Sequence, residues 1–407
     1  MKNRMNVHSR ILGIFCIISF WLCALPLTGC AQEAATTPVA LPQVYWAEQI
    51  AGENRVVYPV ISGLSDENIQ NAINQDMFVT LHAGDMLTRL ERIRQRTQEE
   101  QAQRTLYMEG DATVSGQLLS VMVRTRGEQY DGSSGDSVMC LNYDLSTGEQ
   151  MTLDDLFTDP AAAKERMQSL IEKQVLPELS AYLANNDVLP LPEDSFYLDE
   201  KGIVFYYPQE RFSMISGRVG ACAFYYYEIR EWLDTESDRF GTLFATDYEQ
   251  ADAAELIEKA VSEGVIPQLP FALDVRVGTY LETYPLINDP DYTLTSLVYQ
   301  FEDPVLRQSG VETWVYDEAP EEERKITAIR SSRIDFYGIQ VGISTLDECS
   351  ALLGEPRETL SYDEEQAVDM LLTSGESLLY TFGDNELEIH ADEQGIVSCV
   401  IVRAGAV

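Results

Sequence analysis

The chain has 407 residues, of which 67 are acidic and 28 are basic, so its formal net charge at neutral pH is −39. A nucleic-acid-binding protein needs a basic surface for the phosphates, and this surplus of acid excludes that class. Hydrophobic residues make up 45% of the chain, which is enough for packed cores and excludes a disordered acidic tail.

The chain begins with the pattern of a secretory signal peptide. Lys2, Arg4 and Arg10 give a positive start, and the apolar stretch 11–27 follows. About 17 apolar residues are marginal for a membrane-spanning helix. The stretch ends in Leu-Thr-Gly-Cys, which resembles the bacterial lipobox, where the signal is removed and the cysteine is lipidated. We therefore expect a lipid on Cys30 and a body outside the cytoplasm, with an uncleaved N-terminal anchor as the alternative.

Removal of this leader changes the charge balance further. The leader holds three basic residues and no acidic ones, so 25 Lys and Arg remain against 67 Asp and Glu, a formal charge of −42. Acidic lipid headgroups repel such a body, so we expect contact with the membrane through the lipid alone. The charge either keeps the protein soluble or attracts a cationic partner.

Helices and strands alternate irregularly in the first half of the body. Apolar residues from Ile69 to Leu90 recur at helical spacing and predict one long amphipathic helix that contains Gly84. Asp159 followed by Pro160 predicts an N-cap and the first position of a second helix. The expected strands are 56–61, 106–116, 118–125, 138–145, 196–198, 203–207 and 219–229. The predicted fold class is therefore α+β, with an antiparallel sheet and two helices.

The second half begins with an acidic helix over 247–264, which we interpret as a connector. Beyond it, residues 275–329 and 339–402 share an order of strand, helix and further strands, which favours a duplicated α+β unit of about seventy residues. In the later copy we expect Ser344 to cap a helix over 346–353 that Gly354 ends.

These elements predict the following domain organisation. It comprises a signal peptide (1–29), a tether (30–42), an N-terminal α+β domain (43–240), a helical connector (241–264), and two α+β repeats (265–335 and 336–407).

The body carries little that is typical of a catalytic or metal site. Only His82 and His390 remain after the leader, and neither stands in a zinc-binding or protease motif. Nucleophile elbows, P-loops and dinucleotide-binding glycine motifs are absent from the sequence. We therefore expect no catalytic residue, metal or cofactor, although the many carboxylates leave a glycosidase pair open.

Four cysteines remain after Cys30, two in each half of the body. Outside the cytoplasm, Cys140 with Cys222 and Cys349 with Cys399 could each form a disulfide. The alternative is that all four are small buried apolar residues.

Tyrosines cluster in the segment 206–227. On alternating strands, half of such residues face away from the core unless both faces of the sheet are covered. We therefore name Tyr207, Tyr225, Tyr226 and Tyr227 as candidate partner-binding residues, with burial under a helix as the alternative.

Residues 44–234 resemble a known pair of envelope domains of unknown function, DUF4163 and DUF3298. The resemblance is carried by residues 58–64 leading into 68–74, by 147–157, by 196–206 and by 217–233. Members include the extracellular part of a lysozyme-sensing anti-sigma factor and the non-catalytic part of a peptidoglycan deacetylase. The resemblance implies an α+β envelope domain that binds a protein or a wall polymer.

Two departures limit this resemblance. The sequence has no cytoplasmic anti-sigma segment before the leader, and it lacks the metal motif of the deacetylase, so neither activity carries over. The C-terminal half, from Gly338 onward, is similar to the small α+β repeats of beta-lactamase-inhibitor and outer-membrane-assembly lipoproteins, which is a fold resemblance only.

Together these patterns predict a non-catalytic, lipid-anchored binding protein on the outer face of a Gram-positive-type cell membrane. We expect its partner to be a cationic protein such as lysozyme, or peptidoglycan. The alternatives are a wall-glycan hydrolase that uses paired carboxylates, and an envelope assembly adaptor that docks through the C-terminal repeats.

Overall fold

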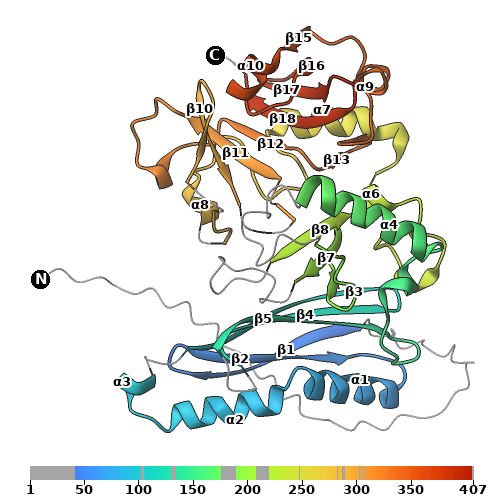
Figure 1. Ribbon diagram of the computed structural model, residues 1–407, viewed down its shortest axis with the longest axis vertical. Helices are drawn as coiled ribbons and strands as arrows, with labels where there is room; N and C mark the ends of the chain where they lie inside the picture. Colours follow the sequence, from blue (N-terminus) through green and yellow to red (C-terminus); the bar gives the residue numbers. More distant parts are fainter. Residues whose placement is uncertain are drawn as a thin grey trace, which may run out of the picture. The chain divides into compact units, whose positions relative to one another are not determined.

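The fold is α+β and is built on sheets of five, three, eight and two strands (Figure 1). The computed structural model describes residues 42–101, 105–129, 134–175, 189–207, 220–246, 248–281, 283–286, 289–301, 303, 305–306 and 308–405. The predicted signal peptide, Cys30 and nearly all of the tether lie outside these residues. Among the helices that are described, none has the length and apolar character needed to cross a bilayer.

The five-stranded sheet follows chain order and carries two helices on one face (Figure 1). Its strands pair antiparallel except at β2–β3, which pair in parallel because helices α1 and α2 form the crossover between them. Ile73, Met77 and Leu90 of these helices pack with Val56 and Val121 of the sheet. The elements are β1 (Gln43–Ala51), β2 (Asn54–Ser62), α1 (Glu67–Thr80), α2 (Ala83–Arg94), α3 (Gln98–Gln101), β3 (Leu106–Ser115), β4 (Leu118–Glu128) and β5 (Ser134–Asp144).

The prediction of one continuous helix from Ile69 to Leu90 is wrong. Helix α1 ends at Thr80 and α2 begins at Ala83, and His82 between them has a left-handed φ of 52°. A left-handed residue cannot continue a right-handed helix, so the backbone breaks at His82. The helical spacing of apolar residues nevertheless continues from α1 into α2.

A three-stranded antiparallel sheet and several short helices form the second core. Asp159 caps α4 as predicted, because its carboxylate accepts a hydrogen bond from Ala162 N at 3.2 Å. The predicted strand 219–229 is too long, because β8 ends at Tyr225 and α6 begins at Tyr226. The elements are η1 (Leu153–Leu156), α4 (Pro160–Leu170), η2 (Ile171–Val175), β6 (Phe196–Leu198), β7 (Gly202–Tyr206), β8 (Ala221–Tyr225), α6 (Tyr226–Ile229) and η5 (Asp238–Phe240).

The eight-stranded sheet is antiparallel throughout and joins both predicted repeats. Its order is β15-β16-β17-β18-β12-β11-β10-β9, which is symmetric about the central β12–β18 pair. The two segments therefore share one sheet and one core, while the predicted duplication and domain bounds stay predictions. The strands are β9 (Asp291–Tyr292), β10 (Ser296–Gln300), β11 (Ser309–Trp314), β12 (Ala328–Ser331), β15 (Glu358–Tyr362), β16 (Gly375–Phe382), β17 (Asn385–Asp392) and β18 (Val397–Ala404).

Helices α7 and α9 cover one face of this sheet, and the loop after α10 packs on the other. Ile257 of α7 and Cys349 of α9 pack into the core on one face, so α7 is part of this core as well as lying between the two halves of the chain. Leu372, just after α10, packs on the opposite face with Ala328 and Ile401. The remaining elements are η6 (Gln250–Asp252), α7 (Ala253–Glu263), α8 (Gly278–Leu281), η7 (Glu321–Glu323), β13 (Asp335–Phe336), β14 (Ile339–Gln340), α9 (Leu346–Leu353) and α10 (Glu364–Asp369).

The bounds and C-terminal end of α9 are as predicted, but its cap is not. Gly354 follows the helix with a φ of 83°. Thr345 is the N-cap and shares a capping box with Glu348. Ser344 instead accepts a hydrogen bond from Gln340 N at 2.9 Å, one residue before the cap.

The four cysteines of the described part are thiols. Cys222 packs in the core of the three-stranded sheet, whereas Cys140 packs with Ala223 on the other face. Cys349 and Cys399 are likewise on opposite faces of the eight-stranded sheet. Side chains on opposite faces of a sheet cannot approach to disulfide distance, so these pairings are excluded in this fold.

Candidate functional site

The structure buries all four tyrosines named from the sequence. Their exposed fractions are 2% for Tyr207, 7% for Tyr225, 6% for Tyr226 and 9% for Tyr227. The expectation of an exposed tyrosine strip is therefore wrong. Both faces of the sheet are covered here, because Tyr207 and Tyr226 pack into the core beneath α4 while Tyr225 and Tyr227 contact the C-terminal half of the chain.

Tyr225 and Tyr227 connect segments that are far apart in the chain. Their rings stack with centroids 5.7 Å apart. The Tyr225 hydroxyl donates to the Val305 carbonyl, and the Tyr227 hydroxyl donates to the Val341 carbonyl at 3.4 Å. Burial raises the pKa of both phenols, so they stay protonated donors. These side chains hold the fold together and offer no surface to a partner.

A buried ion pair lies beside the two tyrosines. Arg333 donates from Nε to Glu228 Oε1 at 2.9 Å and from a terminal nitrogen to Glu228 Oε2 at 2.6 Å. The two side chains are only 7% and 4% exposed. Burial lowers the pKa of Arg333, but the charge of the Glu228 carboxylate and its hydrogen bonds more than offset this. The pKa of Arg333 is therefore raised overall, and the guanidinium stays charged. The partners are 105 residues apart, and no local pattern marks them.

The pair is also tied to its surroundings. The guanidinium lies over the rings of Phe224 and Tyr225, at 5.5 and 5.4 Å from their centroids. Glu228 Oε2 also accepts a hydrogen bond from Tyr225 N at 2.8 Å. This bond is part of the N-terminal cap of α6, which begins directly after β8 ends. Such a satisfied bidentate pair is typical of a structural element.

Ser377, Glu388 and His390 form a second buried polar cluster, on the face of the eight-stranded sheet beneath the loop after α10. Ser377 Oγ lies 2.8 Å from Glu388 Oε1 and 2.9 Å from His390 Nδ1. His390 Nε2 lies 2.8 Å from the Thr373 carbonyl, so this nitrogen carries the proton. All three side chains are 0% exposed, and burial lowers the pKa of His390.

This cluster has the residue types of a catalytic triad but not the access. A nucleophile must reach its substrate, and Ser377 is sealed under the covering loop. His390 lies in strand β17, and its side chain is packed among its neighbours. Within the described ranges, no three His, Cys, Asp or Glu side chains lie close enough together to hold a metal ion.

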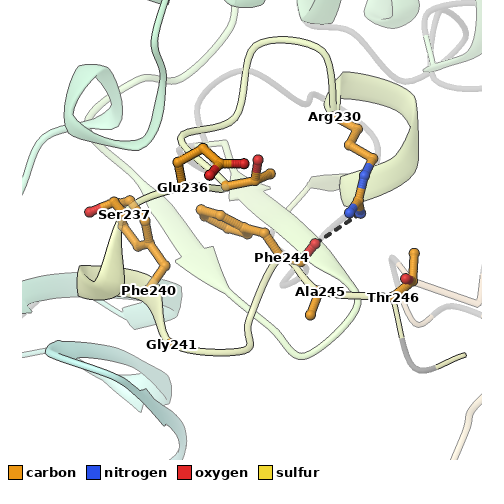
Figure 2. Close-up of a pocket in the computed structure, with 9 residues that line it drawn as sticks. Arg230, Glu236, Ser237, Phe240, Gly241, Phe244, Ala245 and Thr246 are labelled. Atoms are coloured by element: carbon orange, nitrogen blue, oxygen red, sulfur yellow. Dashed lines mark hydrogen bonds between the residues drawn. The ribbon is translucent and has the colours of Figure 1, made fainter. Parts of the chain in front are cut away.

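An open pocket of about 270 Å³ lies in the loop that follows α6 (Figure 2). Phe240 and Phe244 lie beneath it. They are 1% and 3% exposed, and the centroids of their rings are 4.7 Å apart. Its rim is polar and exposed. The lining residues are Arg230, Thr235, Glu236, Ser237, Phe240, Gly241, Phe244, Ala245 and Thr246.

The turn between β3 and β4 positions this loop. Gln117 N donates to the Arg239 carbonyl at 2.7 Å, and Ser115 Oγ donates to the Phe240 carbonyl at 2.7 Å. Across the pocket, Arg230 donates to the Phe244 carbonyl at 2.9 Å, as Figure 2 shows. The pocket is therefore built from a loop that is held at both ends.

The pocket suits binding of a small polar molecule more than hydrolysis. The hydroxyls, the guanidinium of Arg230 and the carboxylate of Glu236 around its rim suit the polar groups of a small molecule, while the two rings beneath them are almost fully buried. A glycoside hydrolase needs two carboxylates about 5–10 Å apart. The lining has one, Glu236. No sequence motif marks the loop, so the pocket could not be predicted from the sequence.

Comparisons with known proteins give remote likenesses. No family model matches the chain, and no curated protein matches it. A DUF3298 family protein from Bacteroides fragilis NCTC 9343 is 15% identical over 48% of this chain and 93% of its own, with a TM-score of 0.35. A DUF3298 family protein from Pseudomonas aeruginosa PAO1 is 11% identical over 50% of this chain and 98% of its own, with a TM-score of 0.31.

A third similar structure belongs to another family of unknown function. The DUF4309 family protein YjgB from Bacillus subtilis strain 168 is 15% identical over 38% of this chain and 97% of its own, with a TM-score of 0.28. The function must therefore be argued from the residues of this chain.

Proposed function

We propose that this protein is a lipid-anchored binding protein on the outer face of a bacterial cell membrane, where it binds a cationic protein and catalyses no reaction. The observation that carries this proposal is the excess of 67 acidic over 28 basic residues. Such a field accelerates encounters with a positively charged partner and repels acidic surfaces.

The geometry of the described residues supports binding over catalysis. The Ser377–His390 contact is sealed from solvent, and the pocket lining holds one carboxylate. The pocket also favours a second ligand, peptidoglycan. The hydroxyls of its rim and the guanidinium of Arg230 suit the polar groups of a wall sugar that carries an acyl or carboxylate group.

One pull-down tests the cationic partner. We expect the soluble body, residues 31–407, to retain lysozyme at about 50 mM salt. The amount retained should fall ~10-fold or more at about 500 mM, because salt screens exposed charges. An acidic protein of similar size is the control and should not be retained. No retention of lysozyme or of isolated cell wall at low salt would sink the proposal.

A second arm of the same experiment separates the two ligands. If peptidoglycan binds in the pocket, Arg230→Gln should weaken retention by isolated wall while lysozyme retention stays as in the wild type. Equal wall retention by wild type and variant would exclude the pocket as a wall-binding site.

A further inference from the structure

Exposed apolar side chains gather at one end of the eight-stranded sheet. Ten large hydrophobic residues of the described part are exposed, and six of them lie in the segments 292–316 and 368–371. Four of these make up what we name the aromatic patch. They are Leu294 (63% exposed), Trp314 (56%), Tyr316 (70%) and Val368 (70%).

Backbone contacts join the segments that carry the aromatic patch. Trp314 pairs with Ser296 across β10 and β11, and Val315 N donates to the Thr295 carbonyl at 2.9 Å. Leu294 N in turn donates to the Asp369 carbonyl at 3.3 Å, which brings the end of α10 alongside. These bonds place the segments of the patch next to one another, from β11 to α10.

Trp314 and Tyr316 present their rings to solvent together. They flank Val315, which packs against the core at the turn that follows β11. The two rings meet edge to face with centroids 5.9 Å apart. This contact joins the two rings into a single aromatic surface.

The segments that carry the aromatic patch are acidic, although Arg324 and Lys325 follow directly after Glu323. Residues 291–296, 312–323 and 363–372 contain no Lys or Arg. The nearby Arg330 is already held by Glu312 at 3.1 Å and by the Leu371 carbonyl at 2.7 Å, and its side chain is 9% exposed. The eleven carboxylates of these segments are Asp291, Glu312, Asp317, Glu318, Glu321, Glu322, Glu323, Asp363, Glu364, Glu365 and Asp369.

We propose that the aromatic patch is the docking surface for the cationic protein partner, an inference that rests on the proposed function. Arg and Lys side chains of the partner stack on the rings of Trp314 and Tyr316, and the surrounding carboxylates pair with their charges. A second copy of this chain and an acidic membrane are disfavoured as occupants, because both carry the same sign of charge as the patch.

The test compares a patch variant with a matched control. The probes are lysozyme and a nona-arginine peptide, and binding to residues 31–407 is measured as Kd at about 50 mM salt. This body contains the whole of the compact unit Ala40–Val407. We expect Trp314→Ala/Tyr316→Ala to weaken binding of both probes at least ~10-fold. The control, Tyr45→Ala on β1, removes a ring of the same 56% exposure and should bind as the wild type.

A second variant addresses the charges without touching the rings. Glu318→Lys, on an exposed side chain, should weaken binding of both probes and flatten its salt dependence. Circular dichroism and an unchanged Tm should show that each variant is folded.

The outcomes separate this inference from the proposed function. If the wild type binds lysozyme and the double variant binds it with the same Kd, the patch is not the docking surface, although the proposed function stands. If the double variant loses wall retention alone, the patch binds sugar and the inference is overturned. If the wild type binds neither probe, the proposed function fails and the inference fails with it.

Discussion

At the scale of single residues, the contact between Arg333 and Glu228 shows how the protein keeps charges in its interior. Each carboxylate oxygen accepts a hydrogen bond from the guanidinium, and the Tyr225 backbone N–H adds a third. A buried ion pair of this kind adds little net stability compared with apolar side chains in the same place. Removal of one partner, however, leaves the other charge buried without a counter-ion.

We therefore expect Arg333→Met to lower the free energy of unfolding by about 3–5 kcal/mol, because Glu228 is left buried without its counter-ion. Urea denaturation measures the loss. Lys325→Met is the control, since Lys325 and Asp274 are 60% and 80% exposed and such a pair contributes no more than about 1 kcal/mol. Similar losses in the two variants would contradict the structural role of the buried pair.

At the scale of elements, the pocket depends on two turns that meet through glycines. Gly116, in the β3–β4 turn, has a φ of 57°, and Gly241, which follows η5, has a φ of 56°. A Cβ on Gly241 would come within 2.6 Å of Gly116 N, and one on Gly116 within 2.5 Å of Gly241 N. Only glycine permits both the left-handed backbone and this close approach.

Gly241 also has a ψ of −120°, outside the left-handed helical region, so Gly241→Ala should destabilise the protein by more than the ~1–2 kcal/mol that a left-handed helical alanine costs. Gly395→Ala provides the matched comparison, because Gly395 has a φ of 78° but a Cβ added there would meet no atom within 4 Å. The difference in urea midpoint between the two variants reports the steric clash. Equal midpoints would mean that the two turns do not pack against each other through Gly116 and Gly241.

Elements also show where local sequence is sufficient. Pro160 after Asp159, and Gly354 after Leu353, marked a helix start and a helix end correctly, because capping involves only neighbouring residues. The break at His82 was missed because apolar spacing reports the buried face and not the backbone conformation. The pocket was missed for a related reason, since its floor and rim are set by docking on the β3–β4 turn.

At the scale of the whole molecule, the proposed role requires an acidic body attached to a membrane through its N-terminus. A single acyl chain gives only weak attachment, so stable anchoring needs more than one. We propose that Cys30, the last residue of the Leu-Thr-Gly-Cys sequence, carries the lipid that supplies this attachment.

Cys30→Ala should abolish incorporation of a labelled fatty acid and release the mature body from the membrane fraction or leave the leader uncleaved. Metabolic labelling followed by fractionation measures both effects. Cys140→Ser is the control, because burial raises the pKa of the Cys140 thiol and leaves it unreactive, so this variant should keep the label. Wild-type protein found in the cell interior with its leader intact and without label would overturn the anchoring.

The sequence by itself determined the acidity, the α+β class and several helix ends, because these depend on composition and on neighbouring residues. Only the tertiary structure decided that Tyr225 and Tyr227 are buried, that Arg333 meets Glu228, and that β12 pairs with β18. Each of these contacts joins residues that are tens of positions or more apart in the chain. The periodicity of apolar residues shows that a helix or strand has an apolar face, but only the packed fold determines what covers that face.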